Sequence, residues 1–283
     1  MNVKIFSAII ALTLASLACG VDLDLPRQRE PGPVVTDEIT VPVPKSGETR
    51  LKLSFGAGEM TLSPGARKNL VEGTATYNYE QFKPVVHSDG SSVEIQMEDV
   101  QFNGWPAFNE IRNEWDFKLS DEPMELVIEA GAYHATYELG GLSLTDLSVT
   151  DGAADVELSF SEPNRTQMSL LRYESGASDI KMQGLSNANF GLLTFNGGAG
   201  DYTLDFSGEL QRDATVNIET GFSNIILVIP EGINANVTVE SGVSNINAGP
   251  GWDQNGDRYT RDGDGHTLTI VVEMGAGNLT LTR

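Results

Sequence analysis

The sequence predicts an all-β fold, a right-handed parallel β-solenoid with coils of about 22 residues. One observation is a phrase that recurs eight times: a glycine, a small or apolar residue, any residue, and a polar residue that is usually Asp or Asn. Another is its spacing, which stays at 21 to 24 residues over the middle five intervals. A third is that alternating apolar and polar runs flank the phrase, which is typical of strands with one face in a core. The phrases begin at Gly56, Gly131, Gly152, Gly176, Gly198, Gly221, Gly242 and Gly275.

Each coil is expected to contain two short strands and two turns. The run Leu192–Phe195 precedes Gly198, for example, and the run Tyr202–Phe206 follows it. We expect the leading glycine at a position of positive φ or of close backbone approach, and the Asp or Asn to close the turn. A second turn, here Ser207–Gly208, closes the coil. Because no coil can bury its apolar side alone, the coils should stack ~4.8 Å apart and share one core.

Four segments resemble the bacterial toast-rack family, which is related to the extracytoplasmic domain of Lia-type cell-envelope stress regulators and to adhesin-like solenoids. They are Phe55–Gly58, Asn113–Leu119, Glu129–Ala132 and Gly197–Gly208. The resemblance spans residues 49–283 and implies a stacked β fold with no assigned catalysis. The Lia-type regulators carry several membrane spans that this sequence does not have, so a direct regulatory role does not follow from the resemblance.

The N-terminus predicts export. Residues 1–18 read as a lipoprotein signal peptide, because Lys4 precedes an apolar run, Ile5–Leu17, that is too short for a lasting membrane span. The following Ala18-Cys19 step resembles a bacterial lipobox, so Cys19 is the candidate lipid-attachment residue. An ordinary signal peptide with an incidental cysteine is the alternative. We therefore expect an exported lipoprotein on the outer face of a bacterial membrane, without disulfides because Cys19 is the one cysteine.

The repeats define one domain with two irregular parts. Residues 19–48 are rich in proline and predict an extended tether, with an edge strand at Ile39–Val43 as the alternative. The solenoid domain should then cover residues 49–283. Within it, residues 66–123 interrupt the period and concentrate aromatic residues, which predicts a cap on the stack or, alternatively, a recognition surface. Because the chain ends directly after the last strand, we expect an open sheet edge there.

The charge limits the classes of partner. The formal net charge is −22, and removal of the single Lys in the signal peptide makes it −23. Such a surface should repel nucleic acid and anionic lipid head groups, so no nucleic-acid partner is expected. The expected partners are an envelope protein or polysaccharide, together with the membrane through the N-terminal lipid.

Two groups of acidic residues are candidates for Ca²⁺. Asp155, Asp179 and Asp201 should form a column one coil apart, which either binds Ca²⁺ or forms Asx-turns that face solvent. The second group follows the order of a calcium loop, although its position 6 is not glycine; the alternative is a solvated hairpin packed through Trp252 and Tyr259. Its candidate ligands are Asp253, Asn255, Asp257 and Asp264. Apart from Ca²⁺, no cofactor is expected.

Signals for catalysis are weak. His87, His134 and His266 are far apart in the sequence, and a Gly-x-Ser-x-Gly phrase is absent. The sequence therefore favours a non-enzymatic, lipid-anchored protein of the cell envelope that binds a partner or acts as a scaffold. An accessory role in an envelope stress response is a second hypothesis, and it depends on the family resemblance alone. A carbohydrate-active β-helix enzyme with carboxylates on nearby coils is a third.

Overall fold

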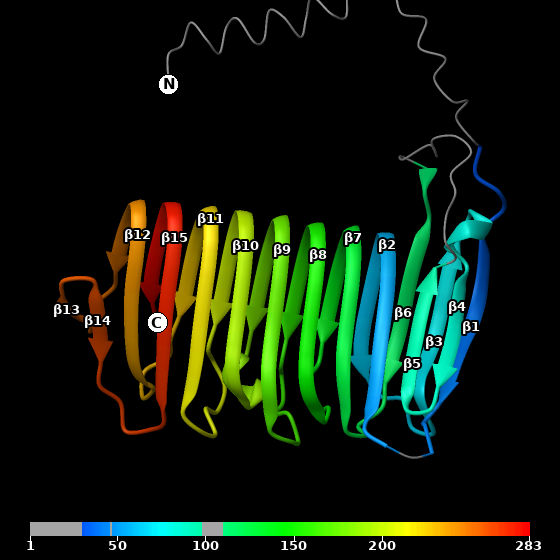
Figure 1. Cartoon of the computed structure of the whole chain (residues 1–283), viewed down its shortest axis with the longest axis horizontal. Coiled ribbons are helices and arrows are strands. Elements are labelled where there is room, and N and C mark those ends of the chain that lie inside the picture. The colour runs from blue at the N-terminus through cyan, green and yellow to red at the C-terminus, as the bar shows by residue number, and fades with distance from the viewer. Residues whose placement is uncertain (1–29, 46, 98–109) are drawn as a thin grey trace, which may run out of the picture.

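Eight long strands, one for each glycine phrase, form the body of the protein (Figure 1). The structure is a computed structural model and describes residues 30–45, 47–97 and 110–283. Each strand rises along one face, bends at its glycine and descends along the other face, so one continuous strand replaces the two short strands predicted for each coil. The eight are β2 (Thr49–Pro64), β7 (Met124–Glu138), β8 (Leu144–Ser159), β9 (Met168–Gln183), β10 (Phe190–Asp205), β11 (Ala214–Val228), β12 (Asn234–Ala248) and β15 (Thr267–Thr282).

All eight strands pair in parallel, in the order β2-β7-β8-β9-β10-β11-β15-β12. The register places equivalent positions of the phrase opposite one another, for example Asp155 opposite Asp179 and Asp179 opposite Asp201. The predicted all-β stack of parallel strands is therefore confirmed, and with it the predicted column of aspartates.

The last strand does not lie at the edge of the stack. β15 pairs with β11 on one side and with β12 on the other, so the stacking order departs from the order of the sequence. The expectation that the final strand forms an open edge was wrong. The reason is that the β13–β14 hairpin, which follows β12 in the chain, pairs with residues 235–238 on the outer edge of β12, and β15 pairs with the opposite edge.

The N-terminal end of the stack is built from shorter strands. β6 (Asn113–Leu119) pairs in parallel with the second half of β2, and β3 (Asn69–Tyr77) and β1 (Val35–Pro42) extend this half-sheet in antiparallel fashion. β5 (Ser92–Met97) pairs with the first half of β2, and β4 (Pro84–Asp89) pairs with β5. Among the described residues, 3₁₀ turns lie at Glu80–Phe82 and Leu185–Ala188.

These strands revise one boundary drawn from the sequence and show where the irregular segment lies. The tether predicted for residues 19–48 overlaps the sheet, because residues 35–42 form the edge strand that was the alternative. In the irregular segment 66–123, the described strands lie at the end of the stack, where a cap was expected. Its described aromatic side chains are buried, Trp115 to 1% exposure, so they do not form an exposed recognition surface. Residues 98–109, with Trp105, lie outside the described residues.

At the opposite end, a hairpin of β13 (Asp253–Asn255) and β14 (Arg258–Arg261) covers part of β12. It is the hairpin predicted as the alternative to a calcium loop. Tyr259 is 4% exposed, and Trp252 packs half-buried against the core. Arg261 lies over the Trp252 ring, 4.9 Å from its centroid.

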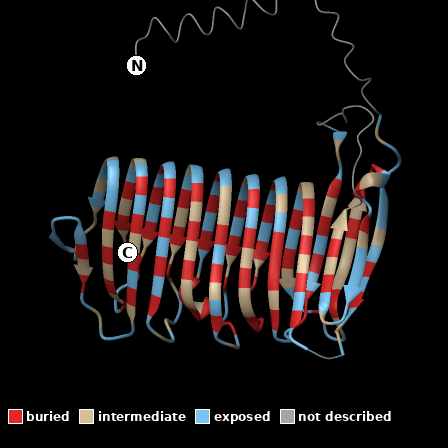
Figure 2. Cartoon of the chain, in the orientation of Figure 1, coloured by how far each residue is buried: buried red, intermediate tan, exposed pale blue. Residues whose placement is uncertain are grey.

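One core runs the length of the stack. Buried and exposed residues alternate along each strand (Figure 2), so every second side chain points between the two faces of the bent strands. Aromatic residues stack within this core, with the rings of Tyr173 and Phe195 5.7 Å apart and those of Phe195 and Tyr202 4.9 Å apart. In the described part of the chain, no helix is long and apolar enough to cross a membrane.

Candidate binding surface at the glycine corner

The leading glycines form a single column at the bend of the strands, which we call the glycine corner. A Cβ atom at Gly176 would lie 2.4 Å from the carbonyl oxygen of Gly152, and one at Gly198 would lie 2.3 Å from that of Gly176. The same relation continues through Gly221, Gly275 and Gly242. None of the eight has a positive φ, and in all but Gly56 the added Cβ would meet the carbonyl oxygen of a neighbouring leading glycine. Close approach of neighbouring backbones, one of the two predicted roles, is therefore why glycine is needed there.

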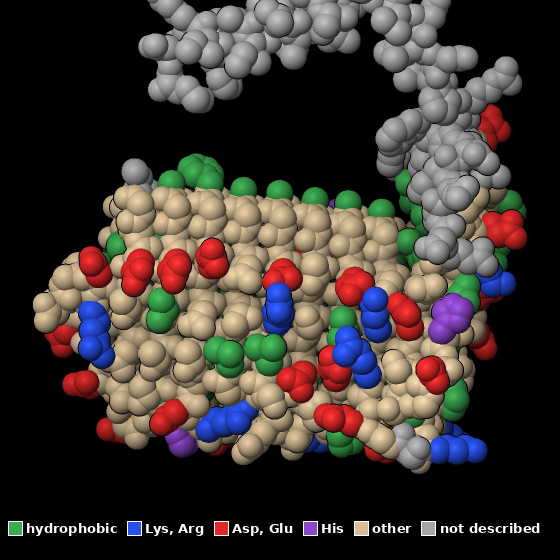
Figure 3. Space-filling view, in the orientation of Figure 1, with side chains coloured by type: hydrophobic (Ala, Val, Ile, Leu, Met, Phe, Trp, Pro, Cys, Tyr) green, Lys and Arg blue, Asp and Glu red, His purple; other side chains and the backbone are tan. Residues whose placement is uncertain are grey.

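A row of small apolar side chains runs along the outside of this corner, and we call it the ridge. It appears as a line of hydrophobic side chains along one edge of the molecule (Figure 3). The residue after each glycine supplies it, and in most strands that residue is alanine. In β11 it is Phe222, which pairs with Ala199 on one side and Ala276 on the other and is 70% exposed. Phe222 is therefore a large apolar group that stands out from a row of methyl groups, which is a common feature of binding surfaces.

On one side of the ridge lies the predicted polar column. Its members follow each glycine by three positions: Glu59, His134, Asp155, Asp179, Asp201, Asn224, Asn278 and Asn245. Hydrogen bonds join its C-terminal part, because Asn278 Nδ2 donates to Asn224 Oδ1 at 2.6 Å and Asn224 Nδ2 donates to Asp201 Oδ1 at 2.7 Å. At the other end, His134 Nδ1 lies 3.5 Å from Asp155 Oδ2.

The three aspartates in the middle of this column interact unfavourably. Partial burial, followed by the charges of Asp155 and Asp201, raises the pKa of Asp179 above its ordinary value. Among the described residues, no cluster of three or more His, Cys, Asp or Glu side chains has the geometry to hold a metal ion. The column is therefore a line of exposed acceptors, and Ca²⁺ binding by it stays a prediction.

On the other side of the ridge lies a second column, which sequence reasoning missed. Its members precede each glycine by two positions, and the row is mostly glutamate. In the N-terminal half these acids have cationic partners: Glu129 lies 2.9 Å from Lys52 Nζ, and Glu174 pairs with Arg172.

In the C-terminal half, Glu219, Glu273 and Glu240 lie opposite one another in β11, β15 and β12. None of the ion pairs found in the described chain includes them. Figure 3 shows acidic side chains in a row beside the ridge over these strands. The three line a groove of about 420 Å³, and we call them the acidic trio.

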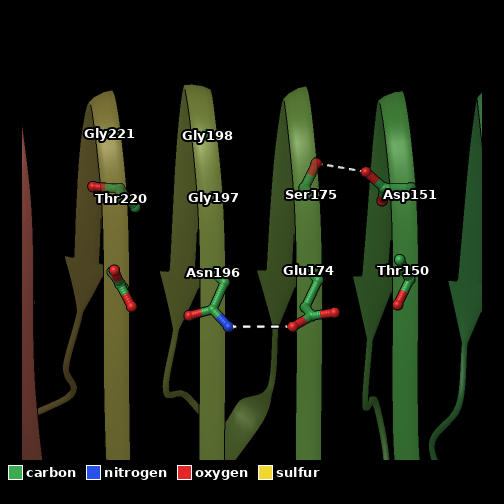
Figure 4. Close-up of a pocket in the computed structure, with 10 residues that line it drawn as sticks. Thr150, Asp151, Glu174, Ser175, Asn196, Gly197, Gly198, Thr220 and Gly221 are labelled. Carbon is green, nitrogen blue, oxygen red and sulfur yellow. Dashed lines mark hydrogen bonds between the residues drawn. The ribbon is translucent and has the colours of Figure 1, made fainter.

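A second groove, of about 430 Å³, lies next to the trio (Figure 4). Glu174, Asn196 and Glu219 line it, and Asp151 lies at one end. The groove holds carboxylates from alternate strands, as the hypothesis of a carbohydrate-active enzyme requires, but its lining includes no Lys or Arg.

Asp151 is a buried acid, 6% exposed, that the sequence reading did not single out. Its Oδ2 accepts a hydrogen bond of 2.6 Å from the Tyr173 hydroxyl, and its Oδ1 accepts from the hydroxyls of Ser175 and Ser178. Burial is the main reason that the pKa of Tyr173 is raised, so the tyrosine remains a donor. The signal in the sequence was an acid directly before the glycine, at the position where other strands place inward-facing residues.

The remaining predicted site residues do not converge. Asp253 and Asn255 are exposed on β13, opposite Thr260 and Arg258, while Asp257 lies in the hairpin turn and Asp264 follows β14. Ca²⁺ binding by this hairpin also stays a prediction. Cys19 lies outside the described residues, so its lipid modification stays a prediction as well.

The fold and the corner define the class: a stack of parallel strands that bend around a column of glycines. Residues 30–171, which are 142 of the 283 residues, match the family described as the N-terminal domain of toast_rack, DUF2154. The chain belongs to the toast-rack family, and the resemblance read from its sequence is confirmed.

Solved structures give weaker likenesses. A proposed cell adhesion protein from Clostridium sporogenes has a TM-score of 0.48 and 21% identity, covering 88% of this chain and 99% of its own. A proposed adhesin from Parabacteroides merdae has a TM-score of 0.44 and 10% identity, with 90% and 99% covered. A proposed lipid-binding protein from Parabacteroides distasonis has a TM-score of 0.40 and 11% identity, with 89% and 99% covered. No curated protein matches this chain.

Proposed function

We propose that this protein is a non-enzymatic binding or scaffold protein of the bacterial cell envelope, exported and anchored by lipid at Cys19. The glycine corner is its binding surface. The observation that carries the proposal is the ridge, where an exposed Phe222 stands beside the acidic trio. A rigid stack that repeats the same side-chain positions from strand to strand offers a long surface of uniform chemistry. We also propose that the stack winds as a right-handed solenoid with coils of about 22 residues.

The charge of this surface indicates the chemistry of the partner. Glu219, Glu273 and Glu240 are adjacent, and none of the ion pairs among the described residues includes them, so a cationic group placed here could interact with three carboxylates. Phe222 supplies apolar contact next to them. An envelope protein or polysaccharide that carries cationic groups meets both requirements.

Co-sedimentation with isolated envelopes tests the binding surface. The Phe222→Ala variant should lower the bound fraction several-fold, because an aromatic side chain is the kind of residue that dominates such contacts. Ile226→Ala is the matched control, since Ile226 is also exposed, at 40%, on the same strand β11 but away from the corner. Equal loss for both variants, or for neither, would contradict the proposed surface.

Fractionation of cells tests the anchor separately. In a Phe222→Ala background, which removes the proposed envelope contact, the Cys19→Ala variant should leave the membrane fraction, because the acyl-modified residue is the remaining attachment that the proposal contains. Retention of the variant on membranes would remove the lipid anchor from the proposal without affecting the binding surface.

An accessory role in an envelope stress response is a second candidate, and membership of the toast-rack family favours it. A deletion strain should then respond differently from wild type to antibiotics that act on the cell wall. An unchanged response would contradict the accessory role and would leave the binding role as the remaining proposal.

A further inference from the structure

Because each strand bends at its glycine, the stack consists of two half-sheets, one before and one after the glycine corner. Each half-sheet has one outer edge at the N-terminal end of the stack and one at the C-terminal end. Additional strands extend three of these four edges. At the N-terminal end, β5 and β4 extend the first half of β2, while β6, β3 and β1 extend its second half. At the C-terminal end, β14 and β13 extend the first half of β12, where residues 235–238 pair with residues 258–261. No strand in the described part of the chain pairs with the outer edge of residues 240–248.

The core is also less covered at this fourth end. Ile225 and Leu279, which point inward from β11 and β15, are 1% and 0% exposed. The equivalent residue of β12 is Ile246, and it is only partly buried. The hydroxyl of Ser244, two residues earlier, is buried without a hydrogen-bond partner. A further strand along this edge would cover the core and supply backbone partners.

The two outer edges of the second half-sheet differ in charge. β1 carries Asp37 and Glu38 and ends at Pro42, and charges and proline are the features that keep edge strands from pairing with other chains. Residues 241–250 contain no charged residue and no proline before Pro250, although 40 of the 283 residues are acidic. Nothing on this edge discourages strand addition.

We propose that the free edge of β12 pairs antiparallel with the same edge of a second copy of this chain. A two-fold axis near Asn245 would place Ser244 opposite Ile246 on the part of β12 that follows the bend at Gly242, so inward-facing residues meet inward-facing residues. Glu240 lies before the bend, on the other side of the ridge, so no two carboxylates oppose each other in this pairing. In a chain with a net charge of −22, this uncharged edge is where two copies approach without direct charge repulsion.

Light scattering coupled to size-exclusion chromatography tests the pairing on the full chain with Cys19→Ala, which removes the lipid. The interface is small, so the mass should rise with concentration from the monomer value of 30.5 kDa towards twice that value. Adding Asn245→Lys places like charges at the two-fold axis and should hold the mass at the monomer value. Asn224→Lys, in the same polar column but two strands inside the edge, should still dimerise.

Crosslinking gives a second measurement that does not depend on a destabilising change. In the Cys19→Ala background the chain has no other cysteine, so Asn245→Cys should form a disulfide-linked dimer under mild oxidation, whereas Asn224→Cys should not. A monomer at all concentrations, or equal crosslinking of both variants, would overturn the proposal. A mass that stays at the monomer value because residues 1–29 of the same chain occupy the edge would overturn it equally.

Discussion

The two ends of each coil achieve the same result, a tight reversal of the chain, by different means. At the glycine corner, backbones of adjacent strands touch directly, and the leading glycines contribute no side chain to the bend. At the opposite end, side chains hold the turns: Asn164, 2% exposed, accepts from the Leu144 amide and donates to the Leu144 carbonyl. Likewise, Asn187 Nδ2 donates to the Phe160 carbonyl at 2.9 Å.

This difference explains why the corner, and not the turns, presents a regular surface. A bend that depends on the absence of a side chain must repeat the same backbone geometry in every strand, and the residues beside it then fall into columns. Turns that depend on individual hydrogen bonds vary in length and composition from coil to coil. The predictions below test this contrast, from the largest expected effect to the smallest.

Substitution at the corner should be the most damaging. Gly198→Ala places a Cβ atom 2.3 Å from the backbone oxygen of Gly176, and neither backbone can move without disturbing the neighbouring strands. We expect a loss of about 3 kcal/mol or more in the free energy of unfolding, measured in urea. The control is Gly256→Ala, where φ is +62° and no atom lies within 4 Å, so only about 1–2 kcal/mol should be lost. A smaller loss at Gly198 than at Gly256 would contradict the close-approach explanation.

Substitution in a turn should cost less. Asn164→Ala leaves the buried amide and carbonyl of Leu144 without their partners, and such unsatisfied groups cost about 1–3 kcal/mol. Urea unfolding measures this loss too. Asn217→Ala, at an exposed position of β11, is the control and should change stability by less than about 0.5 kcal/mol. Equal effects would mean that the turn does not depend on the Asn164 side chain.

The aspartate column should show a small effect of opposite sign. The pKa of Asp179 is raised in the folded state, so its charge opposes folding at neutral pH, and this cost disappears as pH falls through the raised pKa. Asp179→Asn should therefore raise the melting temperature slightly at pH 7, with a gain of a few tenths of a kcal/mol because the site is solvent-exposed. The gain should shrink as the solution is acidified.

Asp116→Asn is the comparison for that measurement. Asp116 is exposed on β6 between Thr61 and Thr74, without an acidic neighbour in register. Its substitution should not raise the melting temperature at pH 7, and the difference between the two variants isolates the repulsion within the column.

The ridge should be the least sensitive part of the corner. Phe222→Ala should change the free energy of unfolding by less than about 0.5 kcal/mol, since 70% of the residue is exposed. Urea unfolding of this variant is also the control for the envelope-binding experiment. A large loss of stability would show that the Phe222 side chain packs against the stack and is not free to contact a partner.

Much of the corner could be read from the sequence because its determinants are local and periodic. The spacing of the glycine phrases predicted that Asp155, Asp179 and Asp201 fall in one column, and the register has them opposite one another. The acidic trio was harder to see, because Glu240 and Glu273 are brought together by strands that are adjacent in space out of sequence order. Phe222 stood in the sequence at a position where alanine is usual, but its exposure depends on which way the corner faces.

The sequence by itself determined that the chain is an all-β stack with a glycine at every bend, because side-chain alternation and backbone contact repeat with each phrase. Only the tertiary structure decided the neighbours: β15 lies between β11 and β12, β1 joins the sheet, and residues 240–248 keep a free edge. The physical reason is that all eight strands carry nearly the same pattern, so each can pair with any other. The connections, the short strands at the two ends and the total number of satisfied backbone groups select one order among these equivalent pairings.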